Sequence, residues 1–350
     1  STLMRSSAAS DVYKRQLLEV LDGEQNSHFV DHYIDMPVDL SEILFIATAN
    51  DLSEVSRPLL DRMEIIEVSS YTKNEKLHIA KEHLVAKQLK KNGLTKKSVR
   101  FTDKALAKII DGYTMEAGVR ELERMIAAVL RKVVRKNYTV GGVNIEKQIV
   151  ITDKNLSEYL GKVKFIKEKA SRKNEVGIVR GLAWTAAGGD TLEIEVNVLG
   201  GKPELILTGN MGDVMRESAQ IALSYVRSVV RKNQIFEENA IHIHIPEGAV
   251  PKDGPSAGIT MATAIYSAVT GKPVDASTAM TGEVTLRGRV MPIGGLKEKL
   301  LAAKTAGLKR VLVPLENKSD VEEFEEEIVQ GLEIVYVSDM KEVLKLAIVK

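Results

Sequence analysis

The chain has 350 residues, and its 49 basic and 48 acidic side chains leave a formal net charge of +1, which gives no general attraction to nucleic acid or to an acidic membrane surface. It contains no cysteine, so disulfides, thiolate metal sites and cysteine nucleophiles are excluded. No apolar run reaches the roughly 20 residues of a membrane helix, and the first residues lack the apolar core of a secretion signal, so we expect a cytoplasmic protein. The length of the chain predicts two to three domains.

The first part of the chain predicts a fragment of an α/β domain. LLEVLDGEQN, which begins at residue 17, predicts a short helix that runs into a turn. EILFIATAND predicts a buried strand that ends in a polar turn, and RPLLDRMEIIEV predicts a helix followed by a second strand.

Residues 71–160 predict a helical domain. In EAGVRELERMIAAVLRKVVRK, apolar residues recur at helical spacing with basic residues between them, namely Val119, Leu122, Ile126, Val129, Leu130 and Val133. Residues 161–175 are rich in charge and have no apolar face, so they predict a linker.

Residues 176–350 predict a second α/β domain. Strands are expected in GIVRGLAWT, TLEIEVNVL, PELILTG, IHIHI and RVLVPL. Helices are expected in DVMRESAQIALSYVRSVVRK, SAGITMATAIYSAVTG, LKEKLLAAKTAG and, as a final acidic helix, VEEFEEEIV. VTLRGRVMPIGG predicts a pair of short strands. The expected fold class is therefore α/β, with a helical domain between two α/β parts.

The stretch GPSAG at 254–258 fits G-x-S-x-G, the signature of a serine nucleophile on a sharp turn. In α/β-hydrolases a histidine follows this serine in the chain. All six histidines precede Ser256, namely His28, His32, His78, His83, His242 and His244. The hydrolase order is therefore incomplete, which argues against an unrelated esterase.

The base that accepts the proton of Ser256 must then be a carboxylate, an upstream histidine or a lysine. His242 and His244 alternate with isoleucines, which is typical of a strand with one polar face. A zinc site would need a third and a fourth ligand, and beyond Glu247 the neighbouring sequence supplies none. We therefore expect no metal site.

Lys299 is the most informative of the lysines that follow Ser256. On a helical wheel it falls among Ala302, Ala303 and Ala306, whereas the polar side carries Lys297, Lys304, Glu298 and Thr305. A solvated lysine, with a pKa near about 10.4, is a poor base at neutral pH. Burial can lower a lysine pKa by about 3–5 units, so a buried lysine can serve the serine in a Ser–Lys dyad.

The second half of the chain resembles the proteolytic domain of Lon, the ATP-dependent AAA+ serine protease. The likeness rests on PKDGPSAGITMATA, AMTGEVTLRGRVMPIGGLKEKLLAAKTAG and VLVPLENKSDVEEF, and it covers roughly residues 174–350. It implies that Ser256 is the nucleophile, Lys299 the catalytic lysine and Thr281 a threonine that hydrogen-bonds this lysine. Gly254 would let the chain approach a substrate carbonyl closely. Asp253 is either a helix-capping or turn carboxylate, or an ion-pair partner that holds Lys299 away in a resting state.

The first half also resembles Lon, as a partial AAA+ α/β core over residues 17–70 and a helical small domain over 71–160. The resemblance implies that Asn50 in ILFIATAN is the sensor-1 residue, Arg62 in LLDRMEII the arginine finger and Arg120 in AGVRELER the sensor-2 residue. ATP with Mg²⁺ would be the cofactor of the whole protein. The chain contains no G-x-x-x-x-G-K-[ST] loop to hold the phosphates. Residues 1–16 do not match the family, so we expect a truncated chain with a foreign start.

The sequence therefore predicts a serine endopeptidase of a protein quality-control protease that acts on unfolded or damaged proteins. Its expected assembly is a homohexameric ring, and no membrane partner is expected. The alternative is a non-proteolytic AAA+ partner protein that uses a Lon-like domain as a scaffold. DNA binding has only the weak support of KQLKKNGLTKKSVR at 87–100, a pattern more typical of a solvated helix end and loop.

Overall fold

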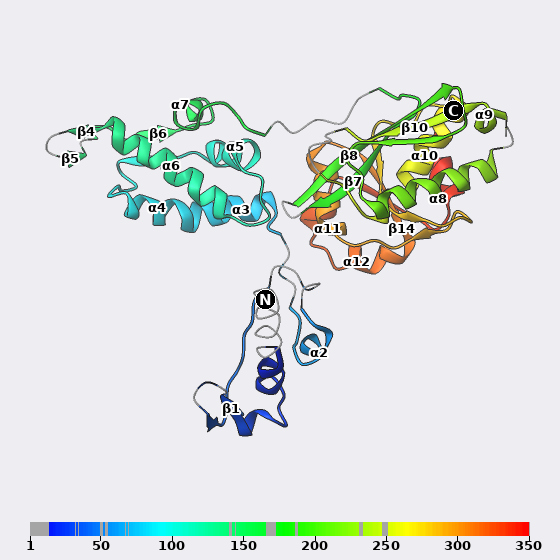
Figure 1. The fold of residues 1–350 in the computed structure, drawn as a ribbon. Coiled ribbons are helices and arrows are strands. Elements are labelled where there is room, and N and C mark those ends of the chain that lie inside the picture. The colour runs from blue at the N-terminus through cyan, green and yellow to red at the C-terminus, as the bar shows by residue number, and fades with distance from the viewer. Residues whose placement is uncertain are drawn as a thin grey trace, which may run out of the picture. The chain divides into compact units, whose positions relative to one another are not determined.

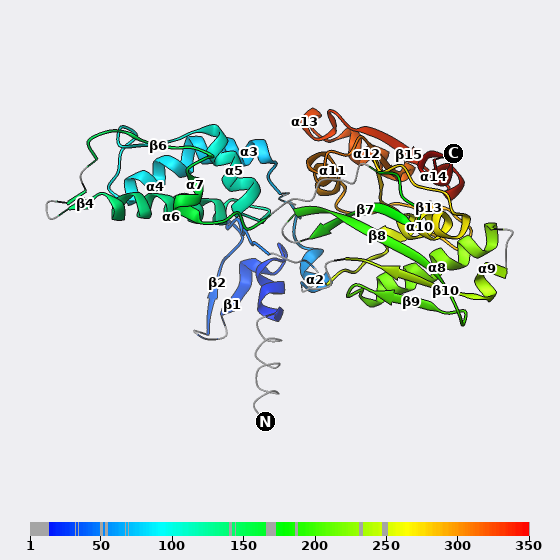
Figure 2. The same cartoon turned by 90° about the horizontal axis from the view of Figure 1, so that it is seen from above.

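The computed structural model describes residues 14–349, except 32, 34, 50–51, 53–54, 67, 69, 140–141, 144, 166–172, 186–187, 231–233 and 247–250. The chain divides into two units, Ser1–Ser69 and Ser70–Lys350 (Figures 1 and 2). Within the described ranges, every helix is too short or too polar to span a bilayer.

The first unit contains a few short elements. Residues 14–20 are helical, as the sequence predicts, and the 3₁₀ turn η1 (Asn26–His28) leads into a two-stranded antiparallel hairpin of β1 (Phe29–Asp31) and β2 (Met36–Val38). The expected helix in RPLLDRMEIIEV is the short α2 (Arg57–Leu60). Pro58 lies in its first turn, where the missing N–H of proline is tolerated.

The two strands predicted for this unit are wrong. Residues 43–49 and 64–66 have no regular structure, and the side chains of Ile46 and Ile66 are 84% and 78% exposed. A strand is stable only when its backbone N–H and C=O groups pair with a neighbour. Among the described residues of this unit only β1 and β2 are paired, so the apolar runs have no ladder to join.

The second unit begins with a helical segment over 70–165. Its elements are α3 (Lys73–Ile79), the π-helical turn η2 (Ala80–Leu84), α4 (Val85–Lys91), β3 (Val99–Phe101), α5 (Asp103–Tyr113), α6 (Arg120–Lys136), β4 (Tyr138–Thr139), β5 (Gly142–Val143), β6 (Ile149–Ile151) and α7 (Leu156–Leu160). The predicted apolar stripe is confirmed, because α6 buries Leu122, Ile126, Val129, Leu130 and Val133 in the core of this segment.

A seven-stranded mixed sheet forms the centre of residues 173–349. Its strand order is β15-β14-β11-β7-β8-β10-β9. The β7–β8 and β8–β10 pairs are antiparallel, and the remaining pairs are parallel. The strands are β7 (Ile178–Thr185), β8 (Gly188–Gly200), β9 (Leu205–Thr208), β10 (Asn239–His244), β11 (Thr278–Met280), β14 (Arg310–Pro314) and β15 (Glu333–Val337).

Helices cover the two faces of this sheet (Figures 1 and 2). Alternate strand residues point to opposite faces, so Met280 and Leu312 join one core while Ala279 and Val311 join another. The first core also contains residues of α8 (Asp213–Val229), α10 (Gly258–Thr270) and α14 (Met340–Ala347). The second contains residues of α11 (Leu296–Thr305), α12 (Lys318–Glu322) and α13 (Glu326–Val329). The α/β class expected from the sequence is confirmed.

Among the remaining elements, one prediction is confirmed, one is wrong and two elements were not predicted. The expected pair of short strands is the antiparallel hairpin of β12 (Glu283–Val284) and β13 (Val290–Met291). The single final acidic helix is wrong. Glu325 has an extended backbone with ψ 144°, which separates α12 from α13 and lets both enter the core. The sequence prediction also omitted β15 and α14. Three short elements complete the unit, namely α9 (Gln234–Glu237), η3 (Pro255–Ala257) and η4 (Leu315–Asn317).

Candidate active site

Ser256 lies in the 3₁₀ turn η3, which leads directly into α10. The residue before this turn, Gly254, has φ +111°, a backbone conformation that residues with a Cβ rarely adopt. A Cβ at Gly254 would meet no atom within 4 Å. Glycine is therefore required here by the backbone angle and not by lack of space.

Hydrogen bonds attach this turn to the chain that follows β11. The carbonyl oxygen of Ser256 accepts from the Gly282 N–H at 2.8 Å and from the Thr281 hydroxyl at 3.3 Å. The Ile259 N–H in turn donates to Gly282 O at 3.1 Å. Since β11 ends at Met280, these bonds fix Ser256 at the carboxyl end of a central strand. They leave the role expected for Thr281, a hydrogen bond to the catalytic lysine, as a prediction.

Asp253 is held by two backbone groups. Its Oδ1 accepts from the Met215 N–H at 2.9 Å and from its own neighbour Gly254 N–H at 2.8 Å. Met215 lies in the first turn of α8, where backbone N–H groups have no partner within the helix. This carboxylate therefore caps α8, as the first of the two readings of Asp253 predicts. The resting ion pair with Lys299 stays a prediction.

Lys299 lies in the first turn of α11, and its residue surface is only 3% exposed. The sequence correctly predicts this burial. Leu296 and Leu300 of the same helix pack in one core with Leu182 of β7. Gly295, the N-cap of α11, packs against the Trp184 ring near the carboxyl end of β7.

The strand directions bring Lys299 and Ser256 to one edge of the sheet. β7 and β11 are parallel neighbours, so their carboxyl ends lie at the same edge. The first turn of α11 lies at this end of β7, and Ser256 is attached at the end of β11. The serine turn, Thr281 and the buried lysine therefore lie at the carboxyl ends of two adjacent strands, β7 and β11.

Burial changes the acid–base properties of Lys299. It lowers the pKa of this ammonium group from 10.5 to about 8, while the negative charge of Glu298 acts in the opposite direction. Burial has this effect because the charged form loses its hydration in the protein interior. With a pKa of about 8, roughly a tenth of the lysine is uncharged at pH 7 and can accept a proton.

The buried position of Glu298 corrects the helical-wheel prediction, which places this residue on the polar side of α11. Its residue surface is 8% exposed. The reason is tertiary: the backbone of Gly189 packs against Glu298 O so closely that a Cβ on that glycine would come within 1.9 Å. A helical wheel carries no information about such a neighbour, so the sequence prediction missed the burial of this charged residue.

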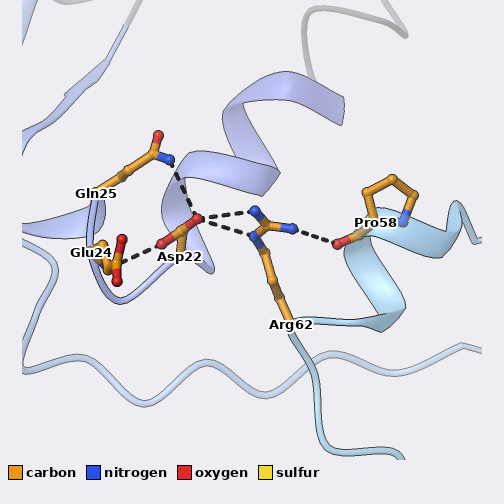
Figure 3. Close-up of polar contacts among 5 residues, drawn as sticks. All are labelled: Asp22, Glu24, Gln25, Pro58 and Arg62. Atoms are coloured by element: carbon orange, nitrogen blue, oxygen red, sulfur yellow. Dashed lines mark hydrogen bonds and ion pairs between the residues drawn. The ribbon is translucent and has the colours of Figure 1, made fainter.

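Arg62, the expected arginine finger, is bound within the first unit (Figure 3). Its Nε and Nη2 atoms donate to Asp22 Oδ2 at 3.3 and 3.1 Å, and Nη1 donates to Pro58 O at 3.0 Å. The backbone N–H of Glu24 and then the Arg62 side chain lower the pKa of Asp22. Asn50, the expected sensor-1 residue, lies outside the described residues.

Arg120, the expected sensor-2 residue, is exposed at the first position of α6. It lines a surface hollow of about 620 Å³ together with Arg124 and Arg131. This hollow belongs to the helical segment, whereas Ser256 and Lys299 belong to the sheet domain. The structure therefore gives Arg120 an accessible position, and its nucleotide role stays a prediction.

His242 and His244 lie on the face of β10 opposite its buried isoleucines. The Thr208 hydroxyl on the neighbouring strand β9 lies 2.9 Å from His242 Nε2 and 2.8 Å from His244 Nδ1. Both imidazoles are therefore engaged on the strand surface, as expected for a strand with one polar face.

Comparison with known proteins gives a consistent result. Residues 150–350 match the family model of the Lon protease (S16) C-terminal proteolytic domain, and residues 90–142 match that of the Lon protease AAA+ ATPase lid domain. Lon protease of Lachnoclostridium phytofermentans is 57% identical over 95% of this chain and 46% of its own length. Lon protease of Bacillus thuringiensis is 56% identical, and Lon protease 1 of Bacillus subtilis is 53% identical, each over 95% of this chain. The chain covers 42% and 43% of these two relatives, so it spans less than half of each relative's length.

Proposed function

The chain belongs to the Lon protease family, and from this premise we propose that it hydrolyses peptide bonds with Ser256 as nucleophile and Lys299 as general base. The observation that carries the proposal is the burial of Lys299, whose pKa falls to about 8, at the sheet edge to which the Ser256 turn is attached. A serine hydroxyl needs a nearby base to become nucleophilic. Lys299 has the proton affinity of such a base.

The proposed reaction has two halves. Lys299 Nζ accepts the hydroxyl proton of Ser256 while Oγ attacks the substrate carbonyl carbon, which gives a tetrahedral oxyanion. Collapse of this intermediate breaks the C–N bond, and the leaving amine takes the proton from Lys299. Water then attacks the acyl ester with Lys299 again as base, which releases the carboxyl product and restores the serine hydroxyl.

The turn around Ser256 supports the charge that develops on the substrate oxygen. Ser256 directly precedes α10, and the first N–H groups of a helix have no partner within it. Such groups stabilise an oxyanion because they are fixed before the reaction begins. The N–H groups of Gly258 and Ile259 already donate to Pro255 O and Gly282 O. We therefore propose that the turn η3, which carries Ser256, provides this environment, with Thr281 as an additional support for the dyad and Gly254 as the residue that gives the substrate access.

The substrates, assembly and nucleotide are proposals drawn from the family. Unfolded or damaged proteins would be the substrates, and a homohexameric ring in the cytoplasm the working assembly. Asn50, Arg62 and Arg120 would sense ATP with Mg²⁺ in the whole protein. In the 350 residues no G-x-x-x-x-G-K-[ST] loop is present, and the Arg62 guanidinium is bonded to Asp22 and Pro58. Asn50, Arg62 and Arg120 alone do not form a complete ATP site, so no step of the peptidase reaction is assigned to ATP.

A fluorogenic peptide assay on the purified chain tests the proposal. The parent should cleave the peptide with or without ATP, and Ser256→Ala should retain less than about 1% of the activity, since loss of a nucleophile costs far more than 10²-fold. Ser224→Ala is a matched control, because this exposed serine of α8 bonds only Gln220 O in its own helix. An inactive parent, or an active Ser256→Ala variant, would contradict the proposed function.

A further inference from the structure

Two consecutive charged residues, Glu298 and Lys299, are buried in the first turn of α11. Their exposed fractions are 8% and 3%. Charged side chains are rarely buried without an interaction that compensates for lost hydration. The proposed reaction uses Lys299 and gives Glu298 no part, so the burial of this carboxylate requires a separate explanation.

Glu298 is held in place through its side chain and through its main chain. The Ser70 hydroxyl donates to its Oε1 at 3.0 Å, and its main chain packs closely against Gly189. Glu298 is also the third residue of α11, where a helix N-terminus favours a negative charge. All three features hold the Glu298 side chain in the helix turn that carries Lys299.

We infer that Glu298 is a positioning residue that attracts the Lys299 ammonium group and so limits how readily this lysine gives up its proton. The inference rests on the proposed function, because it assigns Glu298 a role in the work of the same base. A buried charge pair interacts more strongly than a solvated one, since water screens it less. Glu298 would therefore restrain peptide cleavage at neutral pH and confine full activity to more alkaline conditions.

The direction of the electrostatic effect agrees with this role. Burial is the larger influence and lowers the pKa of Lys299, and the Glu298 charge raises it.

Other charged groups also surround α11. Some lie on the elements packed against this helix, and others line a cavity of about 550 Å³ that Glu298 also lines. Arg180 pairs with Glu193 and Lys73 with Asp111, and Lys76 donates to Glu116 O. The cavity is further lined by Asp190 and Lys164, and α12 and α13 contribute Lys318, Asp320, Glu322, Glu326 and Glu327.

Glu298→Gln tests the inference, since the amide keeps the size and the acceptor for Ser70 and removes the charge. The acid limb of the kcat/KM profile should move to lower pH by about half a unit. This is less than the pKa shift that a directly paired opposite charge produces. With the acid-limb midpoint of the parent at about pH 8, the activity of Glu298→Gln at pH 7 should be about two- to threefold that of the parent, while the alkaline plateau stays unchanged. Glu298→Asp should keep a parent-like midpoint. Glu322→Gln, an exposed α12 residue paired with Lys318, is the control.

A carboxylate with a merely structural role would give a different result. Activity would fall at every pH in Glu298→Gln and the midpoint would not move, which would overturn the inference. A direct NMR titration of isotopically labelled lysine, with the Lys299 signal assigned by its loss in Lys299→Gln, measures the same midpoint without catalysis. An inactive parent would contradict the proposed function, whereas a titration midpoint that is identical in parent and Glu298→Gln would contradict the role of Glu298.

Discussion

The Thr281 hydroxyl donates a hydrogen bond of 3.3 Å to the carbonyl oxygen of Ser256, across 25 residues of chain. Thr281 is completely buried and directly follows β11, so this bond ties the turn that carries the serine to a central strand of the sheet. A strand held on both sides is among the least mobile parts of a domain. The position of Ser256 is therefore set by the sheet as well as by its own helix.

Thr281→Val tests this attachment, because valine keeps the shape of threonine and removes its hydroxyl. We expect kcat/KM for peptide to fall about tenfold or more, since a small displacement of a reacting group is costly. The free energy of unfolding should fall by only about 1 kcal/mol, the usual contribution of one hydrogen bond. Thr281→Ser, which retains the hydroxyl, should stay close to the parent. Equal activity in the valine variant would show that the hydroxyl does not position Ser256.

Gly254→Ala tests the backbone conformation before the nucleophile. Alanine is strained at φ +111°, at a cost of about 1–3 kcal/mol, and a change of this angle would displace Ser256 two residues further on. Peptide cleavage should therefore fall at least about tenfold. Gly201→Ala is the matched control, since Gly201 has φ +145° and equally open surroundings in a loop after β8. It should lose stability and retain activity. If both variants retain full activity, the angle at Gly254 has no role in catalysis.

The sequence predicts those features that depend on neighbouring residues in the chain. The stripe from Leu122 to Val133 on α6 and the position of Lys299 among alanines follow from helical periodicity alone. The G-x-S-x-G spacing likewise indicates the turn at Ser256. The topology of the seven-stranded sheet depends on pairings between distant segments, so periodicity cannot supply it.

The failures of the sequence prediction have the same physical origin. The run that contains Ile46 has the composition of a buried strand, yet it is exposed because no described neighbour pairs with it. Glu298 falls on the polar side of its helix, yet Gly189 and Ser70 bury it from distant parts of the chain. Of the two readings of Asp253, the structure shows the capping of α8, and the resting ion pair stays a prediction. Both errors depend on tertiary neighbours, one absent at Ile46 and the other present at Glu298.

Lys299→Met should stabilise the folded chain at neutral pH. The pKa of Lys299 is about 8 when folded and about 10.4 when unfolded, so the unfolded state binds more protons between these values. Stability therefore rises with pH across this window, and below about pH 8 the buried lysine costs its full penalty. We expect Lys299→Met to gain about 2–3 kcal/mol at pH 7 and progressively less toward pH 10.

Urea unfolding at pH 7 and at pH 9.5 measures this difference, with Lys341→Met, an exposed position on α14, as the control. The gain should shrink at the higher pH in Lys299→Met only. A Lys299→Met variant that is no more stable than the parent at pH 7 would mean that this ammonium group is not desolvated.

The 350-residue chain should cleave peptides but not folded proteins. It has no phosphate-binding loop of the G-x-x-x-x-G-K-[ST] type, and repeated ATP hydrolysis needs such a cradle with its lysine. A folded substrate that is stable by about 5–15 kcal/mol would then remain closed to Ser256. The test adds ATP and Mg²⁺ with a stable folded substrate and follows phosphate release and substrate loss. Its control is the same substrate unfolded beforehand, which should be degraded. Destruction of the folded substrate that depends on ATP would contradict this prediction.

The rate at which a fluorophosphonate labels Ser256 tests the Ser–Lys dyad most directly. In this reaction Oγ displaces fluoride from phosphorus and Lys299 accepts the hydroxyl proton, so no peptide or ATP is needed. Mass spectrometry should find the label on Ser256, with a rate that rises through a midpoint near pH 8, the pKa of the buried lysine. Lys299→Gln should slow labelling at least about 10²-fold, within the range of general base catalysis. Lys304→Gln, whose lysine donates to Glu327 O, should label like the parent. A label on another residue, or a Lys299→Gln variant that is labelled at the parent rate and with the parent pH profile, would contradict the account.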